Sequence, residues 1–273
     1  MDEKILQLKK WIDESDNVVF FGGAGVSTES GIPDFRSVDG LYNQKYKYPP
    51  ETILSHTFFT RYPEEYYKFH REKLVVDGVK PNAAHLKLAE LERQGKLKAV
   101  VTQNIDGLHQ AAGSKEVLEL HGTVKKNYCM KCHKFYDEEY IMNTNGVPKC
   151  GCGGIIKPDV VLYEEGLDSH TLNKAVHYIQ QADMLIIGGT SLAVYPAAGL
   201  TLRWDEIPEL RRRFAAHALS TCKDVRIEAA GLGNQAAMYG YKFCVKELKG
   251  VTPENIGKID GEKILKEHRE VYN

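Results

Sequence analysis

The 273-residue sequence lacks any long hydrophobic run, any excess of one charge and any low-complexity tract. No stretch approaches the roughly 18 uninterrupted apolar residues of a membrane-spanning helix, so we expect no membrane contact. The 36 basic and 37 acidic side chains leave a formal net charge of −1, which argues against bulk binding of nucleic acid because no long-range field attracts a polyanion. With 42% hydrophobic residues, the composition is typical of a globular protein with a sizeable core.

Cysteine is also scarce. The six cysteines, four of them between Cys129 and Cys152, are too few and too clustered for a disulfide framework in a chain of this length. The first 15 residues read as an amphipathic helix rather than a signal peptide. We therefore expect a cytoplasmic protein whose reduced thiolates are available to a metal.

Short apolar runs alternate with helical patterns along most of the chain. Buried strands are expected at 18–21, 97–102, 117–120 and 184–187. Helices are expected at 4–14, 63–74, 82–94 and 172–181. This alternation predicts an α/β fold with a Rossmann-like, doubly wound parallel sheet. Beyond residue 199 only 225–228 and 243–245 are candidate strands, before a final helix from about Pro253.

Two segments interrupt the alternation. Residues 37–81 are rich in Tyr, Phe and His without a clear strand, and residues 125–158 contain the clustered cysteines. We interpret both as parts of a second, smaller domain with a helical segment and a zinc ribbon. Residues 1–36, 82–124 and 159–273 then form the Rossmann-like domain.

The first predicted strand runs into a glycine-rich segment, Gly22–Ser27. Between a strand and a helix, such a segment lets backbone N–H groups approach a phosphate. A plain tight turn is the alternative, because Thr28 stands where the dinucleotide fingerprint needs a third glycine. In the next loop, Arg36 is suited to clamp a pyrophosphate and Phe35 to shield a reactive centre from water, although Arg36 in a surface ion pair is the alternative.

Polar residues also follow the other predicted strands, where open α/β sheets bind their ligands. The second strand is followed by side chains suited to a sugar and an amide, namely Gln103, Asn104 and Asp106. After the third strand comes His121, for which a general base is favoured over a structural role because imidazole titrates near neutral pH. After the fourth strand, Thr190 and Ser191 offer hydroxyls to phosphate oxygens, or a helix cap in the case of Ser191.

The cysteines give the strongest signal. Two short knuckles, C-x2-C and C-x-C, contain Cys129, Cys132, Cys150 and Cys152. Four thiolates in this arrangement are the ligand set of a closed tetrahedral zinc ribbon. Since four protein ligands leave no position for water, we expect one structural zinc that takes no part in chemistry. A set of reduced, unligated cysteines is the alternative.

Together these motifs resemble the sirtuins, NAD-dependent protein lysine deacylases. The resemblance rests on residues 23–36, 102–106, 121–122, the four cysteines, 158–161 and 189–192, within roughly residues 17–200. It implies a large NAD-binding domain, a small zinc domain and a protein lysine deacetylase. Such an enzyme transfers the acetyl group of an acetyl-lysine protein or peptide to ADP-ribose and releases nicotinamide.

The resemblance also implies roles for individual residues. The residues expected around NAD are Gly23, Ala24, Gly25, Thr28, Phe35, Arg36, Gln103, Asn104, Ile105, Asp106, His121, Gly189, Thr190 and Ser191. In the reaction, Asn104 orients the ribose and His121 acts as the base. The peptide adds as an extra strand held mainly through its backbone, bracketed by Val160, Val161 and Val194.

Two departures from the family pattern bear on substrate and cofactor. Tyr67 and His70 stand where members that remove acidic acyl groups have a Tyr-x-x-Arg pair, so we expect acetyl to be preferred over succinyl. The residues that complete the adenosine site in the family have no clear counterpart in 202–273, where 225–228 followed by 231–234 is a candidate replacement. NAD affinity is the property that depends on this tail.

Three other functions are alternatives. A mono-ADP-ribosyltransferase would attach the ADP-ribosyl group of NAD to a protein. A dehydrogenase would leave the bond between nicotinamide and ribose intact, but no acidic residue follows a second strand at the spacing its ribose contact needs. A zinc-ribbon binding module would use lysines near the cysteines. The target protein and the oligomeric state are not specified by the sequence.

Overall fold

A computed structural model describes residues 3–35, 40–76, 78–192, 194, 197 and 200 of the chain. Arg36 lies outside the described residues. The same holds for the elements expected after residue 200, which are the candidate strands at 225–228 and 243–245, the segment 231–234 and the final helix. Among the described helices, none has the length and apolar character needed to cross a membrane.

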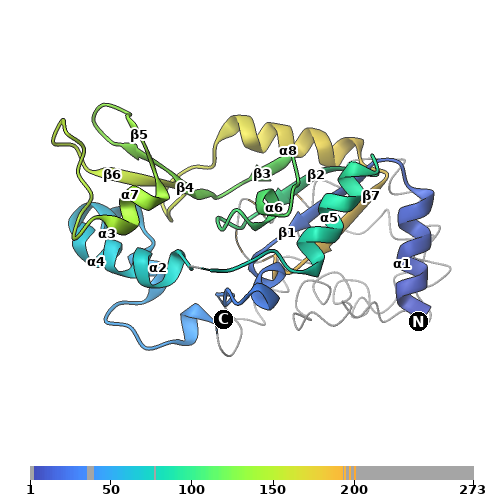
Figure 1. The fold of residues 1–273 in the computed structure, drawn as a ribbon, viewed down its shortest axis with the longest axis horizontal. Coiled ribbons are helices and arrows are strands. Elements are labelled where there is room, and N and C mark those ends of the chain that lie inside the picture. Colours follow the sequence, from blue (N-terminus) through green and yellow to red (C-terminus); the bar gives the residue numbers. More distant parts are fainter. Residues whose placement is uncertain are drawn as a thin grey trace, which may run out of the picture. The chain divides into compact units, whose positions relative to one another are not determined.

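Four strands form a parallel sheet in the order β3-β2-β1-β7 (Figure 1). Their bounds are Val18–Gly22 for β1, Leu97–Thr102 for β2, Val117–Glu119 for β3 and Met184–Gly188 for β7. Each strand agrees with its predicted range to within about one residue, because buried parallel strands are continuous apolar runs. The prediction of a Rossmann-like α/β fold is confirmed.

Both faces of this sheet are covered. Successive side chains of a strand point to opposite faces, so Val18 and Val19 of β1 belong to different apolar clusters. Helix α5 (Ala83–Arg93) packs with Val18, and helix α8 (Ser169–Gln181) packs with Val19. The remaining helices of this part are α1 (Glu3–Glu14) and α6 (Leu108–Ala111).

Capping residues decide where the two covering helices begin. Asn82 caps α5, and the His85 ring accepts the backbone N–H of Asn82 in return. Asp168 caps α8 by accepting the N–H of Thr171 at 2.7 Å. Helix α8 therefore begins before the predicted start at Leu172, because a helix starts after its cap and not at its first apolar residue.

A second, antiparallel sheet has the strand order β5-β4-β6. Its strands are β4 (Gly122–Cys129), β5 (Phe135–Asp137) and β6 (Ile156–Val160). The segment without strand signals forms helices α2 (Pro50–Ile53), α3 (His56–Arg61) and α4 (Pro63–Phe69), and α7 (Glu138–Asn143) follows β5. The helix predicted at 63–74 is α-helical only to Phe69 and continues as a π-helix over His70–Leu74.

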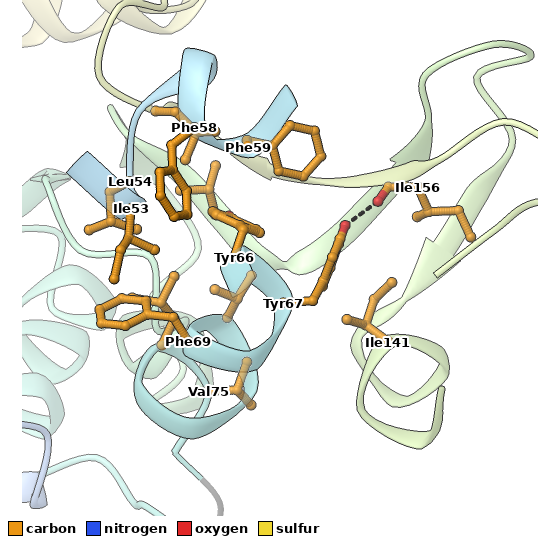
Figure 2. Close-up of a cluster of buried hydrophobic side chains, with 14 of the residues drawn as sticks. Ile53, Leu54, Phe58, Phe59, Tyr66, Tyr67, Phe69, Val75, Ile141 and Ile156 are labelled. Atoms are coloured by element: carbon orange, nitrogen blue, oxygen red, sulfur yellow. Dashed lines mark hydrogen bonds between the residues drawn. The ribbon is translucent and has the colours of Figure 1, made fainter. Parts of the chain in front are cut away.

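One apolar cluster joins these helices to the antiparallel sheet (Figure 2). Tyr66 and Tyr67 of α4 are completely buried and pack with Ile141 of α7 and Ile156 of β6. The Tyr67 hydroxyl donates a hydrogen bond to the Ile156 carbonyl, which satisfies the polar end of this ring inside the cluster. Burial raises the pKa of Tyr67, so its hydroxyl stays a donor.

Candidate active site and metal centre

The four parallel strands end level with one another. Gly22 at the end of β1 lies opposite Thr102 of β2 and Gly188 of β7, and Thr102 lies opposite Glu119 of β3. The loops that follow these strands therefore meet at one edge of the sheet, where open α/β sheets bind ligands. We call this region the sheet-edge site. It contains the loops after β1, β2, β3 and β7, at residues 23–28, 103–107, 120–121 and 189–192.

The glycine-rich loop after β1 packs directly on the loop after β7. Gly25 donates its N–H to the carbonyl of Gly189 at 2.8 Å. A Cβ atom on Gly23 would lie 2.8 Å from Cβ of Thr190, and one on Gly189, whose φ is +61°, would overlap the backbone of Val26. Both positions need glycine because the two backbones approach so closely.

The chain from Ala24 to Ser30 has short helical turns rather than one continuous α-helix. It forms two 3-10 helices of three residues each, Ala24–Val26 and Thr28–Ser30, and the second ends at Gly31 with φ +93°. The Thr28 hydroxyl donates to the carbonyl of Gly25 at 3.0 Å. A phosphate at this loop would therefore meet backbone N–H groups without the dipole of a long helix behind them.

Ser27 connects the loops after β1 and β2. Its hydroxyl donates to Oδ2 of Asp106 at 2.7 Å and accepts a hydrogen bond from Nδ2 of Asn104 at 3.1 Å. The second carboxylate oxygen of Asp106 accepts the N–H of Leu108 at 2.8 Å, at the start of α6. Sequence reasoning gave no role to Ser27, although it ends the glycine-rich segment. Only its tertiary contacts show that it orients both polar side chains.

Gln103 connects the loops after β2 and β7. Its Oε1 accepts a hydrogen bond from the Thr190 hydroxyl at 3.1 Å, and its backbone N–H donates to Gly22 at 2.9 Å. Within the described part of the chain, Nε2 of Gln103 is buried and has no hydrogen-bond partner. Buried donors are normally satisfied, so this amide is suited to an acceptor oxygen of a bound ligand.

His121 follows β3 with its ring oriented by the backbone. Nδ1 lies 3.0 Å from the carbonyl oxygen of Gln103. Because a carbonyl only accepts, Nδ1 carries the proton and the lone pair is on Nε2. Burial lowers the pKa of His121, and the hydrogen bond to Gln103 opposes this shift. The imidazole is thus neutral near pH 7 and can accept a proton at Nε2.

The segment after β6 lies beside His121. Val161 donates its N–H to the carbonyl of His121 at 2.9 Å, directly after Val160 at the end of β6. Phe35 and Ile105 are partly buried and pack against the cluster of Figure 2. His121 is thus bonded to the loop after β2 through its ring and to the segment after β6 through its backbone.

Two of the expected residues lie in the loop after β7. Ser191 and Val194 are both half-buried. The Thr190 hydroxyl accepts a hydrogen bond from the backbone N–H of Leu192 at 3.2 Å, within the same loop. Ala193, Tyr195 and Pro196 lie outside the described residues.

The four cysteines form a compact cluster. All four sulfur atoms lie within 4.8 Å of one another. The Sγ–Sγ distance is 3.5 Å between Cys129 and Cys152, 3.5 Å between Cys132 and Cys150, and 3.4 Å between Cys132 and Cys152. These distances are too long for disulfides. They approach the separation of about 3.8 Å that tetrahedral zinc requires with Zn–S bonds of about 2.3 Å, so the thiol set fits one structural zinc.

Comparisons with family models, curated proteins and solved structures all indicate the Sir2 family. The model of the Sir2 family matches residues 23–196. A relative from Clostridium perfringens named "NAD-dependent protein deacetylase" is 64% identical over 203 residues, which cover 73% of this chain and 83% of that protein. A solved structure of Sir2 with a deacetylated p53 peptide and 3'-O-acetyl ADP ribose is 41% identical with a TM-score of 0.69, covering 75% of this chain and 83% of the other. A Sir2 homolog–NAD complex is 41% identical with a TM-score of 0.67, covering 76% and 79% of the two chains.

Proposed function

The chain belongs to the Sir2 family and is an NAD-dependent protein deacetylase, and on this basis we propose which of its residues perform the reaction. The sheet-edge site binds NAD, and the segment after β6 binds the acetyl-lysine peptide. One observation carries this assignment. Nδ1 of His121 donates to the Gln103 carbonyl, which leaves Nε2 as the proton acceptor, and the His121 carbonyl accepts the N–H of Val161 directly after β6.

The loops of the sheet-edge site supply the contacts to NAD. Backbone groups of the glycine loops, together with Thr28 and Ser191, contact its phosphates and riboses, and the sequence motif assigns Arg36 to the same role. Gln103 donates from Nε2, which lacks a partner among the described residues. Phe35, Ile105 and Asp106 surround the nicotinamide. When bound, NAD supplies a ribose carbon that reacts readily, because the cationic nicotinamide ring is a good leaving group.

Asn104 and His121 are the residues that act on the reacting ribose. Asn104 is 8% exposed, and the bond from its Nδ2 to Ser27 fixes which end of its amide faces the ribose. His121 takes a proton from a ribose hydroxyl at Nε2, which requires the neutral form that burial favours. The apolar side chains of Phe35 and Ile105 limit the access of water to this centre.

The peptide adds as a strand beside β6. Among the described residues, strand β6 is at an edge of the antiparallel sheet, which leaves one side of it for a peptide strand. Val160 and Val161 then contact the peptide on one side and Val194 on the other. A neutral acetyl-lysine enters the apolar surroundings of His121 more easily than the ammonium group of free lysine, because burying an unpaired charge is costly. This difference favours release of the product.

The acyl group removed is acetyl rather than succinyl. Tyr67 and His70 are both buried with their ring centroids 5.9 Å apart, and the Tyr67 hydroxyl is bonded to the Ile156 carbonyl. Burial and the nearby Arg71 lower the pKa of His70 to about 4, so this imidazole is neutral at pH 7. A neutral, buried histidine offers no cation to the carboxylate of a succinyl group.

The large and the small domain have separate functions. We assign residues 1–36, 82–124 and 159–273 to the domain that binds NAD, and residues 37–81 and 125–158 to the smaller domain that zinc holds together. The separate apolar clusters on the two faces of the parallel sheet and around Tyr66 support two parts, and the cluster around Tyr66 also includes Val124, Val160 and Leu162. We propose a cytoplasmic location, because a reducing compartment keeps the four thiolates available to zinc.

A peptide assay tests the proposal. We expect an acetyl-lysine peptide to lose its acetyl group only when NAD is present, with free nicotinamide and an acetylated ADP-ribose as products. His121→Ala should lower turnover by a factor of about 10² to 10⁴, the usual contribution of a general base. His170→Ala, at an exposed position of α8, is the matched control. Unchanged turnover of the His121 variant contradicts the assignment, and labelling of a protein by NAD would indicate ADP-ribosyl transfer instead.

A further inference from the structure

A tight turn at Leu162–Glu165 directly follows the segment proposed to bind the peptide. The N–H of Glu165 donates to the carbonyl of Leu162 at 3.0 Å. Within the turn, Glu164 has φ +77°, a left-handed conformation that is free for glycine and unfavourable for residues with a side chain. In the described part of the chain, only two other non-glycine residues have a positive φ, His133 and Leu192. A strained residue indicates that its surroundings hold it in place.

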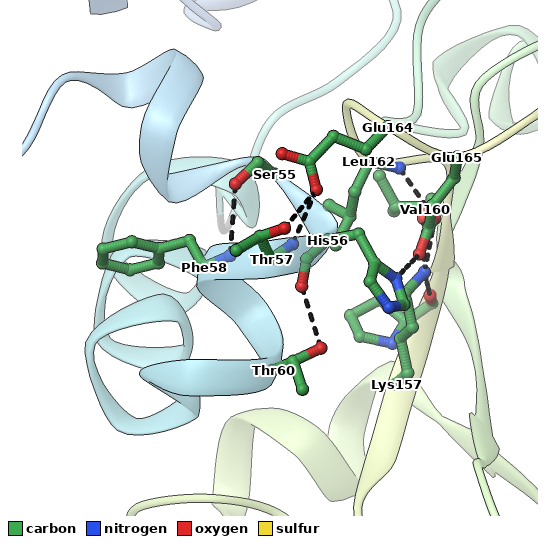
Figure 3. A network of polar contacts seen from close by, with 11 residues as sticks. Ser55, His56, Thr57, Phe58, Thr60, Lys157, Val160, Leu162, Glu164 and Glu165 are labelled. Atoms are coloured by element: carbon green, nitrogen blue, oxygen red, sulfur yellow. Dashed lines mark hydrogen bonds and ion pairs between the residues drawn. The ribbon is translucent and has the colours of Figure 1, made fainter.

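The side chain of Glu164 makes the contact that holds it (Figure 3). Its Oε2 accepts hydrogen bonds from the Thr57 hydroxyl at 2.7 Å and from the Thr57 backbone N–H at 2.9 Å. Thr57 lies in the first turn of α3, where backbone N–H groups have no partner within the helix and a negative charge is favourable. These bonds from Thr57 lower the pKa of Glu164, so it is ionised at pH 7.

Further contacts join the same turn to α3 and β6. Tyr163 donates its N–H to the carbonyl of Leu54 at 2.9 Å, and His56 donates its N–H to the carbonyl of Tyr163 at 3.0 Å. The Glu165 carboxylate lies 3.0 Å from Nζ of Lys157 and 2.8 Å from Nδ1 of His56 (Figure 3). The turn is therefore attached to the start of α3 by backbone and side chains together.

We propose that Glu164 and Thr57 are a positioning pair that sets the geometry of Val160–Val161 and thereby the affinity for the acetyl-lysine peptide. The inference rests on the proposed function, since it requires the peptide to add at this segment. Glu164 acts through the turn and not on the reacting atoms. Glu164→Gly removes both the backbone strain and the attachment to α3, whereas Thr57→Val removes the hydroxyl contact and leaves Glu164 left-handed, so the two variants together separate the contributions.

Steady-state kinetics with an acetyl-lysine peptide and NAD test this proposal. In Glu164→Gly and in Thr57→Val, we expect the KM for the peptide to rise about fivefold, the effect of losing one typical hydrogen bond. The kcat and the KM for NAD should change little, because the sheet-edge site is not altered. Glu164→Gln keeps a hydrogen-bond acceptor and Thr57→Ser keeps the hydroxyl donor, so the peptide KM of both variants should stay close to that of the wild type. Glu139→Gln, an exposed carboxylate on α7, is the matched control.

Two results would overturn the proposal. If the peptide KM of Glu164→Gly equals that of the wild type, the side chain is not needed. If kcat falls and the KM values for peptide and NAD both rise by similar factors, the variant has lost structure in general. If Glu164→Gly does not fold, as judged by thermal unfolding, Thr57→Val decides the question because it replaces one hydroxyl on an exposed residue. An inactive wild-type chain contradicts the proposed function itself, so the two failures are distinguishable.

Discussion

The cysteine centre takes all its ligands from residues 129–152, whereas the sheet-edge site takes its residues from four loops between 23 and 192. In the cysteine centre, two short knuckles bring the sulfur atoms together, and each knuckle is local in sequence. In the sheet-edge site, the level ends of β1, β2, β3 and β7 bring the loops together. A local motif sets its own geometry, and a dispersed site depends on strand register.

The two sites should therefore respond differently to substitution. Structural zinc and the fold around it form together, so the cysteine centre should be lost as a unit. In the sheet-edge site, each loop is held by its own hydrogen bonds, such as those of Ser27 and Gln103. Single changes there should weaken the reaction in steps while the fold persists.

Loss of zinc is expected to have the largest effect. Cys150→Ser, or treatment with a chelator, should unfold the antiparallel sheet and abolish deacetylation, because a structural zinc site contributes folding energy directly. Cys150 and Cys152 precede β6, so the peptide segment would be displaced with them. Zinc content by mass spectrometry, circular dichroism and the peptide assay measure this. A zinc-free chain with full activity would contradict it, and restored activity after adding zinc is the control for chelation.

The pH dependence of stability is expected to be the next largest effect. Burial lowers the pKa of His109 to about 3 and that of His70 to about 4, with His85 and Arg71 adding to the respective shifts. Their unfolded pKa is about 6.5, so below this pH the unfolded chain binds protons that the folded chain does not. The free energy of unfolding should therefore fall with decreasing pH, by about 1.4 kcal/mol per pH unit for each histidine.

Chemical denaturation between pH 6.5 and 5 isolates this effect, because most carboxylates do not titrate in that window. His70→Phe tests the small domain and His109→Phe tests the sheet domain, and each should reduce the slope by up to about 1.4 kcal/mol per pH unit. His170→Phe, at an exposed position, is the control. A slope that neither buried substitution changes would show that other groups control the acid sensitivity.

Removal of the Ser27 hydroxyl is expected to have a smaller effect than loss of zinc or acidification. Ser27→Ala leaves Asn104 and Asp106 without their shared partner. We expect kcat/KM to fall about tenfold, as for the loss of one or two hydrogen bonds that orient reacting groups. Ser114→Ala is the matched control, since its buried hydroxyl has no partner among the described residues. Equal kinetics for the two variants would remove Ser27 from the site.

Several features could be predicted from sequence because their signals are local. Apolar runs located the four parallel strands, since a strand buried on both faces has no polar alternation. The spacing of the cysteines located the metal centre. The start of α8 was missed although Asp168 marks it, because apolar periodicity was given more weight than the cap.

Other features depend on contacts that sequence reasoning did not find. The aromatic-rich segment 37–81 forms helices whose rings pack on Ile141 and Ile156, far along the chain. The contacts of Ser27 with Asn104 and Asp106 span more than seventy residues. The left-handed Glu164 is held by Thr57, a residue on another element, so no local pattern indicates it.

The amino-acid sequence alone determined the α/β class, the metal ligands and the family resemblance, because each depends on residue types at short spacing. The tertiary structure alone decided which nitrogen of His121 carries the proton, which end of the Asn104 amide is bonded to Ser27, and how the turn at Glu164 is held. These properties follow from the orientation of hydrogen-bond donors and acceptors in space. That orientation exists only once strand register has brought distant loops together.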